Sequence, residues 1–273
     1  MPGITLCIPF YRAHDYADSV LEGVFAQTRA PDAILVIDDG SPKPAADSIH
    51  DDRVRIIRHK TNRGLSAARN TALQETTTEF IAFLDADCRP DPAWLQTLER
   101  VLEVSDAIAA GGKLIEFHQK TCVDRWRGVH MRQHWGYRAR INPPWLFGNN
   151  WLARCEPLRD IGGWNEAFRT NMEDVDMSRR LLAAGHNLLY EPAAVVRHLR
   201  TDTRASLFAS RYAWTHPPQI ESIGEVLHHL IVDFARCKYF GLCDFFTGRL
   251  SLLWLDTVFL FYSWSRDFRR GKR

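Results

Sequence analysis

Residues 80–87, with the sequence FIAFLDAD, join five apolar residues to two aspartates that are separated by one alanine. A short, continuous apolar run of this kind predicts a strand that is buried on both faces of a sheet. The alternation continues on both sides of it. Strands are predicted at 4–8, 33–37, 54–58 and 80–84, and helices at 15–27, 45–50, 65–75 and 92–104.

Strands that alternate with helices are typical of an α/β protein whose mainly parallel sheet lies between two helical layers. We therefore expect a Rossmann-like, three-layer α/β/α fold. Later segments are predicted as apolar at 107–117, polar and apolar at 149–154, helical at 173–184 and extended at 187–198. From residue 201 onward the pattern predicts a helical C-terminal tail.

The composition is that of a folded globular protein, with 45% hydrophobic and 25% charged residues in a chain of 273. The net charge of +2 gives no global field for a polyanion, so nucleic acid is not an expected partner. The six cysteines form no Cys-x-x-Cys pair, and the first residues predict a strand instead of a basic leader. We expect a cytoplasmic protein with free thiols.

The most membrane-like stretch, 250–264, is short for a membrane span and contains Asp256. Basic residues follow it up to residue 273, which suits the headgroups of anionic lipids. The tail is therefore expected either to lie peripherally on the inner face of a membrane or to pack against the protein or a second copy. Both alternatives remain open from the sequence.

Ligands of such sheets bind at the carboxyl ends of the strands, so the residues that follow each strand are candidates for binding. The first strand is followed by Pro9-Phe10-Tyr11, the second by Asp38-Asp39-Gly40-Ser41 and the fourth by Asp85-Ala86-Asp87. Carboxylates such as Asp85 and Asp87 suit Mg²⁺ or Mn²⁺, which in turn holds a diphosphate. A polar turn that caps the next helix would also explain them.

Two more charged residues have a functional and a structural interpretation. Asp39 suits the N–H group of a uracil-like base, or it belongs to an ordinary turn. Arg69 follows a glycine and several small residues at 62–70, so it either binds phosphate and orients a carboxylate, or lies in solvent on a tightly packed helix.

Three acids, Glu173, Asp174 and Asp176, open a predicted helix. The helix dipole accounts for two of them, and a third held there by backbone N–H groups would be a well-oriented general base. His198 ends a predicted strand and is either structural or a metal ligand. His130 and His134 are interpreted as surface residues, because no carboxylate is suitably placed beside them in the sequence.

With these residues in view, the chain resembles the family 2 glycosyltransferases, which have the GT-A fold. The resemblance covers about 4–200 and depends on an ordered set of motifs: IPFY at 8–11, SVL at 19–21 with QT at 27–28, VIDDGS at 36–41, NRG at 62–64 with ARN at 68–70, and FLDAD at 83–87. Further motifs at 148–150, 162–166 and 173–176 look like the acceptor-side half of such enzymes.

The resemblance implies residue roles. Pro9, Phe10, Tyr11, Asp39, Arg69, Asp85 and Ala86 would bind the nucleotide sugar; Asp85, Asp87 and His198 would hold Mn²⁺ or Mg²⁺; Asp174 would be the catalytic base; and Asn150, Trp164 and Glu173 would lie on the acceptor side. It also implies a catalytic domain at 1–200, with a donor half at 1–117 and an acceptor half at 118–200, and a helical extension at 201–273.

The implied reaction is the inverting transfer of a hexose or N-acetylhexosamine from a nucleotide sugar, preferably a UDP-sugar, to a hydroxyl of a glycan or lipid-linked sugar. Such a reaction belongs to the synthesis of cell-surface glycans or polysaccharides. Residues 211–214, RYAW, only loosely match the Gln-x-x-Arg-Trp signature of processive members, which favours addition of a single sugar. The alternatives are a nucleotidyltransferase that makes nucleotide sugars and a catalytically silent binding protein.

Overall fold

The computed structural model describes residues 2–216 and 223–270. Its strands form one nine-stranded sheet with the order β3-β2-β1-β4-β8-β6-β9-β5, and β7 pairs with β9. The strands are β1 (Ile4–Phe10), β2 (Ala33–Asp38), β3 (Val54–Arg58), β4 (Phe80–Leu84), β5 (Cys88–Pro90), β6 (Ala107–Glu116), β7 (Arg140–Ile141), β8 (Asn150–Arg154) and β9 (Asn187–His198). The helices around the sheet are α1 (Ala17–Phe25), α2 (Leu65–Glu75), α3 (Trp94–Glu103), α5 (Cys155–Asp160) and α6 (Glu173–Ala183), with short 3-10 turns at His14–Tyr16 and Ala45–Asp47.

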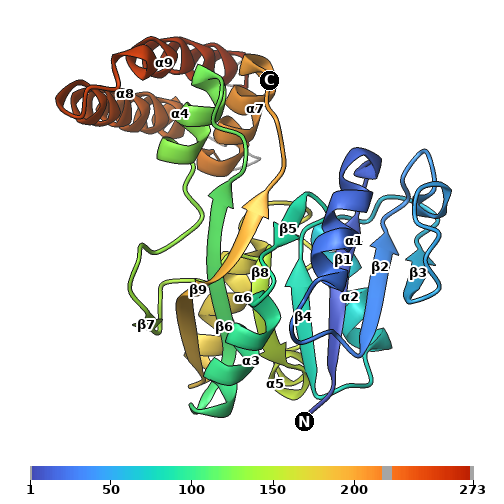
Figure 1. Cartoon of the computed structure of the whole chain (residues 1–273). Helices are drawn as coiled ribbons and strands as arrows, with labels where there is room; N and C mark the ends of the chain where they lie inside the picture. The colour runs from blue at the N-terminus through green and yellow to red at the C-terminus, as the bar shows by residue number, and fades with distance from the viewer. Residues whose placement is uncertain (1, 217–222, 271–273) are drawn as a thin grey trace. The chain divides into compact units, whose positions relative to one another are not determined.

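Most strands of the sheet point in one direction (Figure 1). The strands β1, β2, β3 and β4 are mutually parallel. Because β8 is antiparallel to both β4 and β6, β6 and its parallel partner β9 run with the first four. Only β5, β7 and β8 run the other way within the described sheet. The prediction of a mainly parallel sheet is confirmed.

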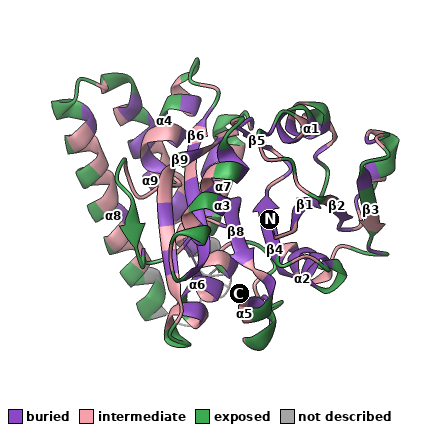
Figure 2. Cartoon of the chain, turned by 60° about the horizontal axis from the view of Figure 1, so that its bottom comes forward, coloured by how far each residue is buried: buried purple, intermediate pink, exposed green. Residues whose placement is uncertain are grey.

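Helices cover both faces of this sheet, as the alternation of side chains along β1 shows. Leu6 and Ile8 pack in one apolar cluster with residues of α1 and α3, whereas Cys7 packs in another with residues of α2 and α6. Both faces of β1, β4 and β8 are therefore buried (Figure 2). This explains why the strands read as continuous apolar runs instead of alternating ones.

Three details differ from the sequence predictions. The helix expected at 45–50 is only the 3-10 turn Ala45–Asp47. The short strands β5 and β7 were not predicted, because two or three residues carry no periodicity.

The six cysteines are free, as the sequence analysis expected.

The second compact unit contains 118–132 and the described residues after 200, whereas 2–117 and 133–200 form the sheet unit. The helices of the second unit, called the helical unit below, are α4 (Cys122–His130), α7 (Arg204–Thr215), α8 (Ile223–Phe246) and α9 (Leu250–Arg270). An apolar cluster of α4, α7 and α9 residues forms its core. The segment 118–132, expected in the acceptor half, thus belongs to the helical unit.

His130 lies in this unit, and the prediction that it is a surface residue was wrong: it is buried and contacts Asp244 of α8. The sequence analysis considered carboxylates near residue 130 only, whereas Asp244 is brought there by folding. Across the described residues, no helix is long and apolar enough to span a bilayer.

Candidate active site

Asp85 and Asp87 lie at the carboxyl end of β4, on the turn that leads into β5. The N–H of Cys88 donates to the carbonyl oxygen of Asp85 over 3.0 Å, which closes this turn. The side chains of Asp85 and Asp87 keep 32% and 27% of their area exposed, although both neighbouring strands are buried. Two partly exposed carboxylates are thus held at the carboxyl end of the central strand β4, where a ligand can reach them.

His198 stands beside Asp87 because of strand register. It is paired with Glu116 of β6 on one side and with Cys88 of β5 on the other. Its Nε2 atom is 3.3 Å from Oδ2 of Asp87, and its Nδ1 atom is 2.8 Å from Oε2 of Glu116. The structure therefore brings together two residues that the sequence analysis grouped, with 111 positions between them.

Glu116 is a site residue that the sequence analysis did not single out. Its one signal was its place, an acid that ends the long apolar segment 107–117, but nothing in the sequence paired that segment with 187–198. A carboxylate on the far nitrogen of a histidine fixes the ring and directs Nε2 toward its own ligand. Burial lowers the pKa of His198, but Asp87 and Glu116 outweigh this and raise it to about 9.

Arg69 of α2 is buried and connects two carboxylates. Its guanidinium donates to Oδ1 of Asp85 over 3.1 Å, to Oε1 of Glu173 over 2.9 Å and to the carbonyl oxygen of Gly148 over 2.8 Å. The side chain is only 1% exposed, so the interpretation of Arg69 as a solvated residue is wrong. Arg69 instead orients carboxylates.

The surroundings of Arg69 are shaped to hold it. The ring of Trp164 lies 4.6 Å from the guanidinium carbon, as expected of a cation–π contact. Asn70, the residue after Arg69, donates to the backbone carbonyl oxygen of Trp164 and accepts from the backbone N–H of Trp164. These two hydrogen bonds fix the loop that carries the Trp164 ring. A Cβ atom at Gly148 would lie 2.8 Å from both terminal guanidinium nitrogens, so this position has no room for a side chain.

Asp174 lies in the first turn of α6 and is oriented by backbone groups. Its Oδ2 accepts from the N–H of Gly148 over 3.1 Å, and its Oδ1 accepts from the N–H of Val175 over 2.8 Å. Burial and then the charge of Glu173 raise the pKa of Asp174 to about 7. A carboxylate with this pKa is suited to accept a proton near neutral pH.

The turn before α6 has an uncommon backbone. Asn171 and Met172 have φ angles of 62° and 68°, in the left-handed region that residues other than glycine rarely adopt. Such strain concentrates where surrounding structure fixes a functional residue. Here it sets the direction in which α6 begins, and thus the positions of Glu173 and Asp174.

Asp39 lies at the end of β2 and accepts three hydrogen bonds. His59 Nδ1 and the N–H of Arg63 lie 2.7 and 2.8 Å from Oδ1, and the N–H of Gly64 lies 2.7 Å from Oδ2. A carboxylate has about four lone-pair directions, so one remains for a further donor. Asp39 is therefore an anchor for the loop 62–64, and its side chain is 5% exposed.

Pro9 and Phe10, the last two residues of β1, differ in exposure from Tyr11, which follows them. Tyr11 is 43% exposed and available to stack on a base, whereas Pro9 and Phe10 are buried. Phe10 packs in the core with α1, as does Ala86 after β4. The side chains of Phe10 and Ala86 face the core, so contact with a nucleotide is left to their backbone groups.

Two predicted acceptor-side residues are also buried. Asn150 is fully enclosed, its Oδ1 accepts from Trp94 Nε1 over 2.6 Å, and its amide group donates to the Ala194 carbonyl, so it is a structural residue of β8. Trp164 is 2% exposed and supports Arg69 instead of offering a surface for a sugar. Glu173, the third residue predicted on the acceptor side, is also buried, and acceptor contact at these three positions stays a prediction.

A different aromatic group is accessible. Trp135, Trp145 and Phe147 are partly exposed, and their ring centroids are 4.6 to 6.1 Å apart. Trp135 also donates from Nε1 to the carbonyl oxygen of Trp145 over 2.7 Å, which fixes the pair. This cluster precedes Gly148, the residue that contacts both Arg69 and Asp174.

Comparison with known proteins agrees with this geometry. Residues 5–170 match the profile of Glycosyl transferase family 2. Pre-mycofactocin glycosyltransferase of Mycobacterium tuberculosis is 33% identical over 175 residues, which cover 60% of this chain and 37% of the relative. The chain thus spans well under half the length of this curated relative.

Solved structures share the fold at low identity. GalNAc-T7 with UDP, GalNAc and Mn²⁺ superposes with a TM-score of 0.57 at 16% identity, over 72% of this chain and 44% of that one. The mannosyltransferase PcManGT from Pyrobaculum calidifontis, in complex with GDP-Man and Mn²⁺, superposes with a TM-score of 0.58 at 19% identity, over 77% and 60%.

The α/β fold of this chain, with its mostly parallel sheet, is the GT-A fold of these neighbours, so the fold prediction is confirmed. The profile match covers more than half of the chain. The chain belongs to glycosyltransferase family 2.

Proposed function

We propose that this protein is an inverting, metal-dependent glycosyltransferase that moves a sugar from a nucleotide donor to an acceptor hydroxyl. The observation that carries the proposal is the arrangement around Arg69. This one buried guanidinium contacts Asp85 of the acidic turn and Glu173, the neighbour of the candidate base Asp174. Gly148 joins the same guanidinium to Asp174, because its carbonyl oxygen accepts from Arg69 and its N–H donates to Asp174.

The donor set fits a divalent cation. Oxygen atoms of Asp85 and Asp87 and Nε2 of His198 would hold Mn²⁺ or Mg²⁺, and Glu116 already occupies the other nitrogen of the ring. A bound cation would neutralise the charge that develops on the leaving diphosphate. The Mn²⁺ in two solved neighbours with the same fold supports this choice.

The chain's own residues would supply the remaining chemistry. Asp174 takes the proton of the acceptor hydroxyl while the hydroxyl oxygen attacks the anomeric carbon of the donor sugar. On the opposite face of that carbon, the bond to the nucleotide diphosphate breaks. One displacement inverts the anomeric configuration. Arg69 keeps Asp85 and Glu173 in place during this step, so the site needs little reorganisation.

The donor is proposed to be a UDP-sugar carrying a hexose or N-acetylhexosamine. Asp39 keeps an acceptor direction for the N–H of a pyrimidine base, and the exposed ring of Tyr11 is available to stack on it. The partly exposed cluster of Trp135, Trp145 and Phe147 is proposed to stack on a glycan or lipid-linked acceptor. A role in cell-surface glycan or polysaccharide synthesis follows from such an acceptor.

The test is calorimetric titration of UDP, with and without Mn²⁺, into the protein and its Asp87→Ala variant. We expect Mn²⁺-dependent binding to the parent, loss of that dependence in the variant, and parental behaviour in Asp52→Asn, whose carboxylate is exposed and outside the site. Equal Mn²⁺-dependent affinity in parent and Asp87→Ala would refute the metal assignment. A thermal-shift panel of nucleotide sugars then identifies the donor.

The helical unit is proposed to contact a membrane surface or a second copy through outward-facing apolar residues. These are Leu227, Ile231, Phe234, Tyr239, Leu242, Phe245, Phe246, Leu250, Trp254 and Phe261, each at least 45% exposed. An exposed apolar face on this scale is uncommon on a soluble monomer. The corresponding location is the cytoplasm, at the inner face of the membrane.

A further inference from the structure

The hairpin formed by α8 and α9 buries acids between its helices. Among the residues of α8 whose burial is described, only Asp233 and Asp244 are buried. The opposite helix, α9, buries Asp256 and Asp267 along with leucines. Burying a carboxylate costs free energy unless it is paired or bound to a cation. The partners of these acids therefore decide what the hairpin can bind.

Asp244 and Asp256 approach one imidazole, that of His130 on α4. The Nε2 atom of His130 is 2.9 Å from Oδ2 of Asp244 and 3.8 Å from Oδ1 of Asp256. The three residues are exposed by 8%, 0% and 3%, respectively. One ligand atom from each lies within 4.8 Å of the other two, which is close enough for all three to bind a single ion.

Part of this cluster lacks a partner. Oδ1 of Asp256 accepts a hydrogen bond from Trp126 Nε1 over 2.7 Å, but Oδ2 of Asp256 accepts none from the described chain. Asp244 has Arg249 as a cation partner, with Nε of Arg249 2.8 Å from its Oδ1, whereas no ion pair of Asp256 with an arginine or lysine is found among the described residues. The cluster therefore has acceptor capacity for a cation.

A similar arrangement occurs a second time, with one acid eleven residues before Asp244 on α8 and the other eleven residues after Asp256 on α9. The Nε2 atom of His216 is 3.2 Å from Oδ2 of Asp233 and 3.5 Å from Oδ2 of Asp267. Asp267 accepts from the hydroxyl of Tyr212 through Oδ1, while its Oδ2 again accepts no hydrogen bond from the described residues. Each cluster therefore contains one buried carboxylate oxygen that accepts no hydrogen bond from the described residues.

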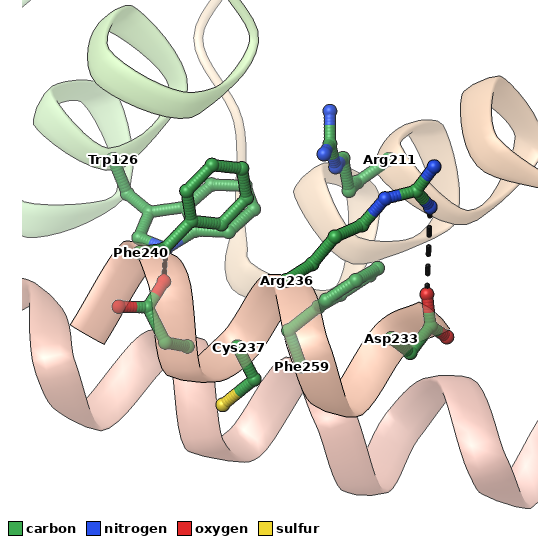
Figure 3. Close-up of a pocket in the computed structure, with 8 residues that line it drawn as sticks. Trp126, Arg211, Asp233, Arg236, Cys237, Phe240 and Phe259 are labelled. Atoms are coloured by element: carbon green, nitrogen blue, oxygen red, sulfur yellow. Dashed lines mark hydrogen bonds and ion pairs between the residues drawn. The ribbon is translucent and has the colours of Figure 1, made fainter. Parts of the chain in front are cut away.

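A cavity gives solvent a place beside the first cluster (Figure 3). Its lining includes Trp126, Cys237 and Asp256, together with Arg211 and Arg236. A histidine, two carboxylates and one position open to water form a ligand set that Zn²⁺ accepts.

We propose that His130, Asp244 and Asp256 form a binding site for a divalent transition-metal ion of the Zn²⁺ type, separate from the acidic turn after β4. The ion would bind Nε2 of His130, whose proton would then reside on Nδ1, and one oxygen each of Asp244 and Asp256. It would join α4, α8 and α9 and compensate the buried negative charge. This proposal does not depend on the glycosyltransferase assignment.

The test uses the full chain with Asp87→Ala, so that the acidic turn does not contribute metal. After Zn²⁺ loading and dialysis, bound zinc per chain is measured by elemental analysis in this background alone and with His130→Ala or Asp256→Asn added. We expect loss of about one equivalent from either addition. His50→Gln, an exposed histidine, is the matched control and should retain the parental amount.

A second measurement separates ligand loss from misfolding. Co²⁺ bound to the background protein should give visible absorption bands that Zn²⁺ abolishes, and Zn²⁺ should raise its melting temperature but not that of Asp256→Asn. If the background binds no zinc, or if both added variants keep its full stoichiometry while folded, the site is refuted. In that case no cation compensates the buried carboxylate of Asp256, and Asp256→Asn should leave the melting temperature unchanged or raised.

Discussion

The carboxylate of Glu116 lies 2.8 Å from Nδ1 of His198, on the side of the ring that faces away from Asp87. This contact fixes which nitrogen of His198 is available to a cation. We expect Glu116→Gln to weaken Mn²⁺ affinity by about 10-fold to 100-fold, as is usual when the carboxylate partner of a histidine ligand is lost. Calorimetry with Mn²⁺ and UDP measures this. Unchanged affinity would show that His198 needs no such support.

Asp174→Asn separates catalysis from donor binding. We expect it to keep the affinity for donor and Mn²⁺ and to lose transfer activity by about 10²-fold to 10⁴-fold, the usual contribution of a positioned base. Single-turnover rates with a radiolabelled donor give the comparison. Asp176→Asn is the matched control, because Asp176 binds Arg180 on the same helix. A larger loss in Asp176→Asn would reassign the base.

The pH dependence of the parent should report the same residue. The pKa of Asp174 is raised to about 7 by burial and the charge of Glu173, and a base acts only when deprotonated. We therefore expect kcat/KM to rise tenfold per pH unit below about pH 7 and to level off above it. Activity that is flat from pH 5.5 to 8, with the protein folded, would contradict this role.

Arg69→Ala should destabilise the fold as well as abolish activity. It leaves the carboxylates of Asp85 and Glu173 without their cation, a change that costs about 3–5 kcal/mol of unfolding free energy at a buried pair. Chemical denaturation gives the value. Arg63→Ala, which removes an exposed pair with Glu166, should cost no more than about 1 kcal/mol. Similar costs for both would mean that Arg69 is not structurally important.

The apolar face of the helical unit should bind anionic liposomes in a salt-dependent manner. We expect the full chain to float with such vesicles at low salt, less so at high salt, and not at all when Phe245, Phe246 and Trp254 are changed to serine. Tyr137→Ser, also at an exposed aromatic, is the control. A chain that never floats but forms a dimer, which the triple variant loses, would establish the second-copy alternative.

The fold followed from the sequence to the extent that it depends on local pattern. The run 80–87 and the other N-terminal strands were predicted because strands such as β4, which is buried on both faces, consist of apolar residues. The acids at the strand ends were found for the same reason. The short strand β5 was missed, although it sets the register of His198 beside Asp87, because three residues have no period.

Burial was the main limit on the candidate site. Arg69, Asn150 and Trp164 lie in motifs that the sequence analysis associated with ligand binding. All three are at most 2% exposed, and their side chains contact other residues of the protein. Glu116 and the partners of His130 depend on contacts across 82 and 114 positions, which one sequence cannot reveal. Long-range pairing, and not local propensity, decided these outcomes.

Gly148 shows how narrowly the site constrains its own variation. Its carbonyl oxygen binds Arg69, its N–H binds Asp174, and a Cβ atom there would displace a guanidinium that two carboxylates hold. Even alanine would disturb the acidic turn and the base together. If random substitutions at this position were selected for sugar transfer, we expect glycine alone to be recovered. The smallest residue of the site would then tolerate no replacement.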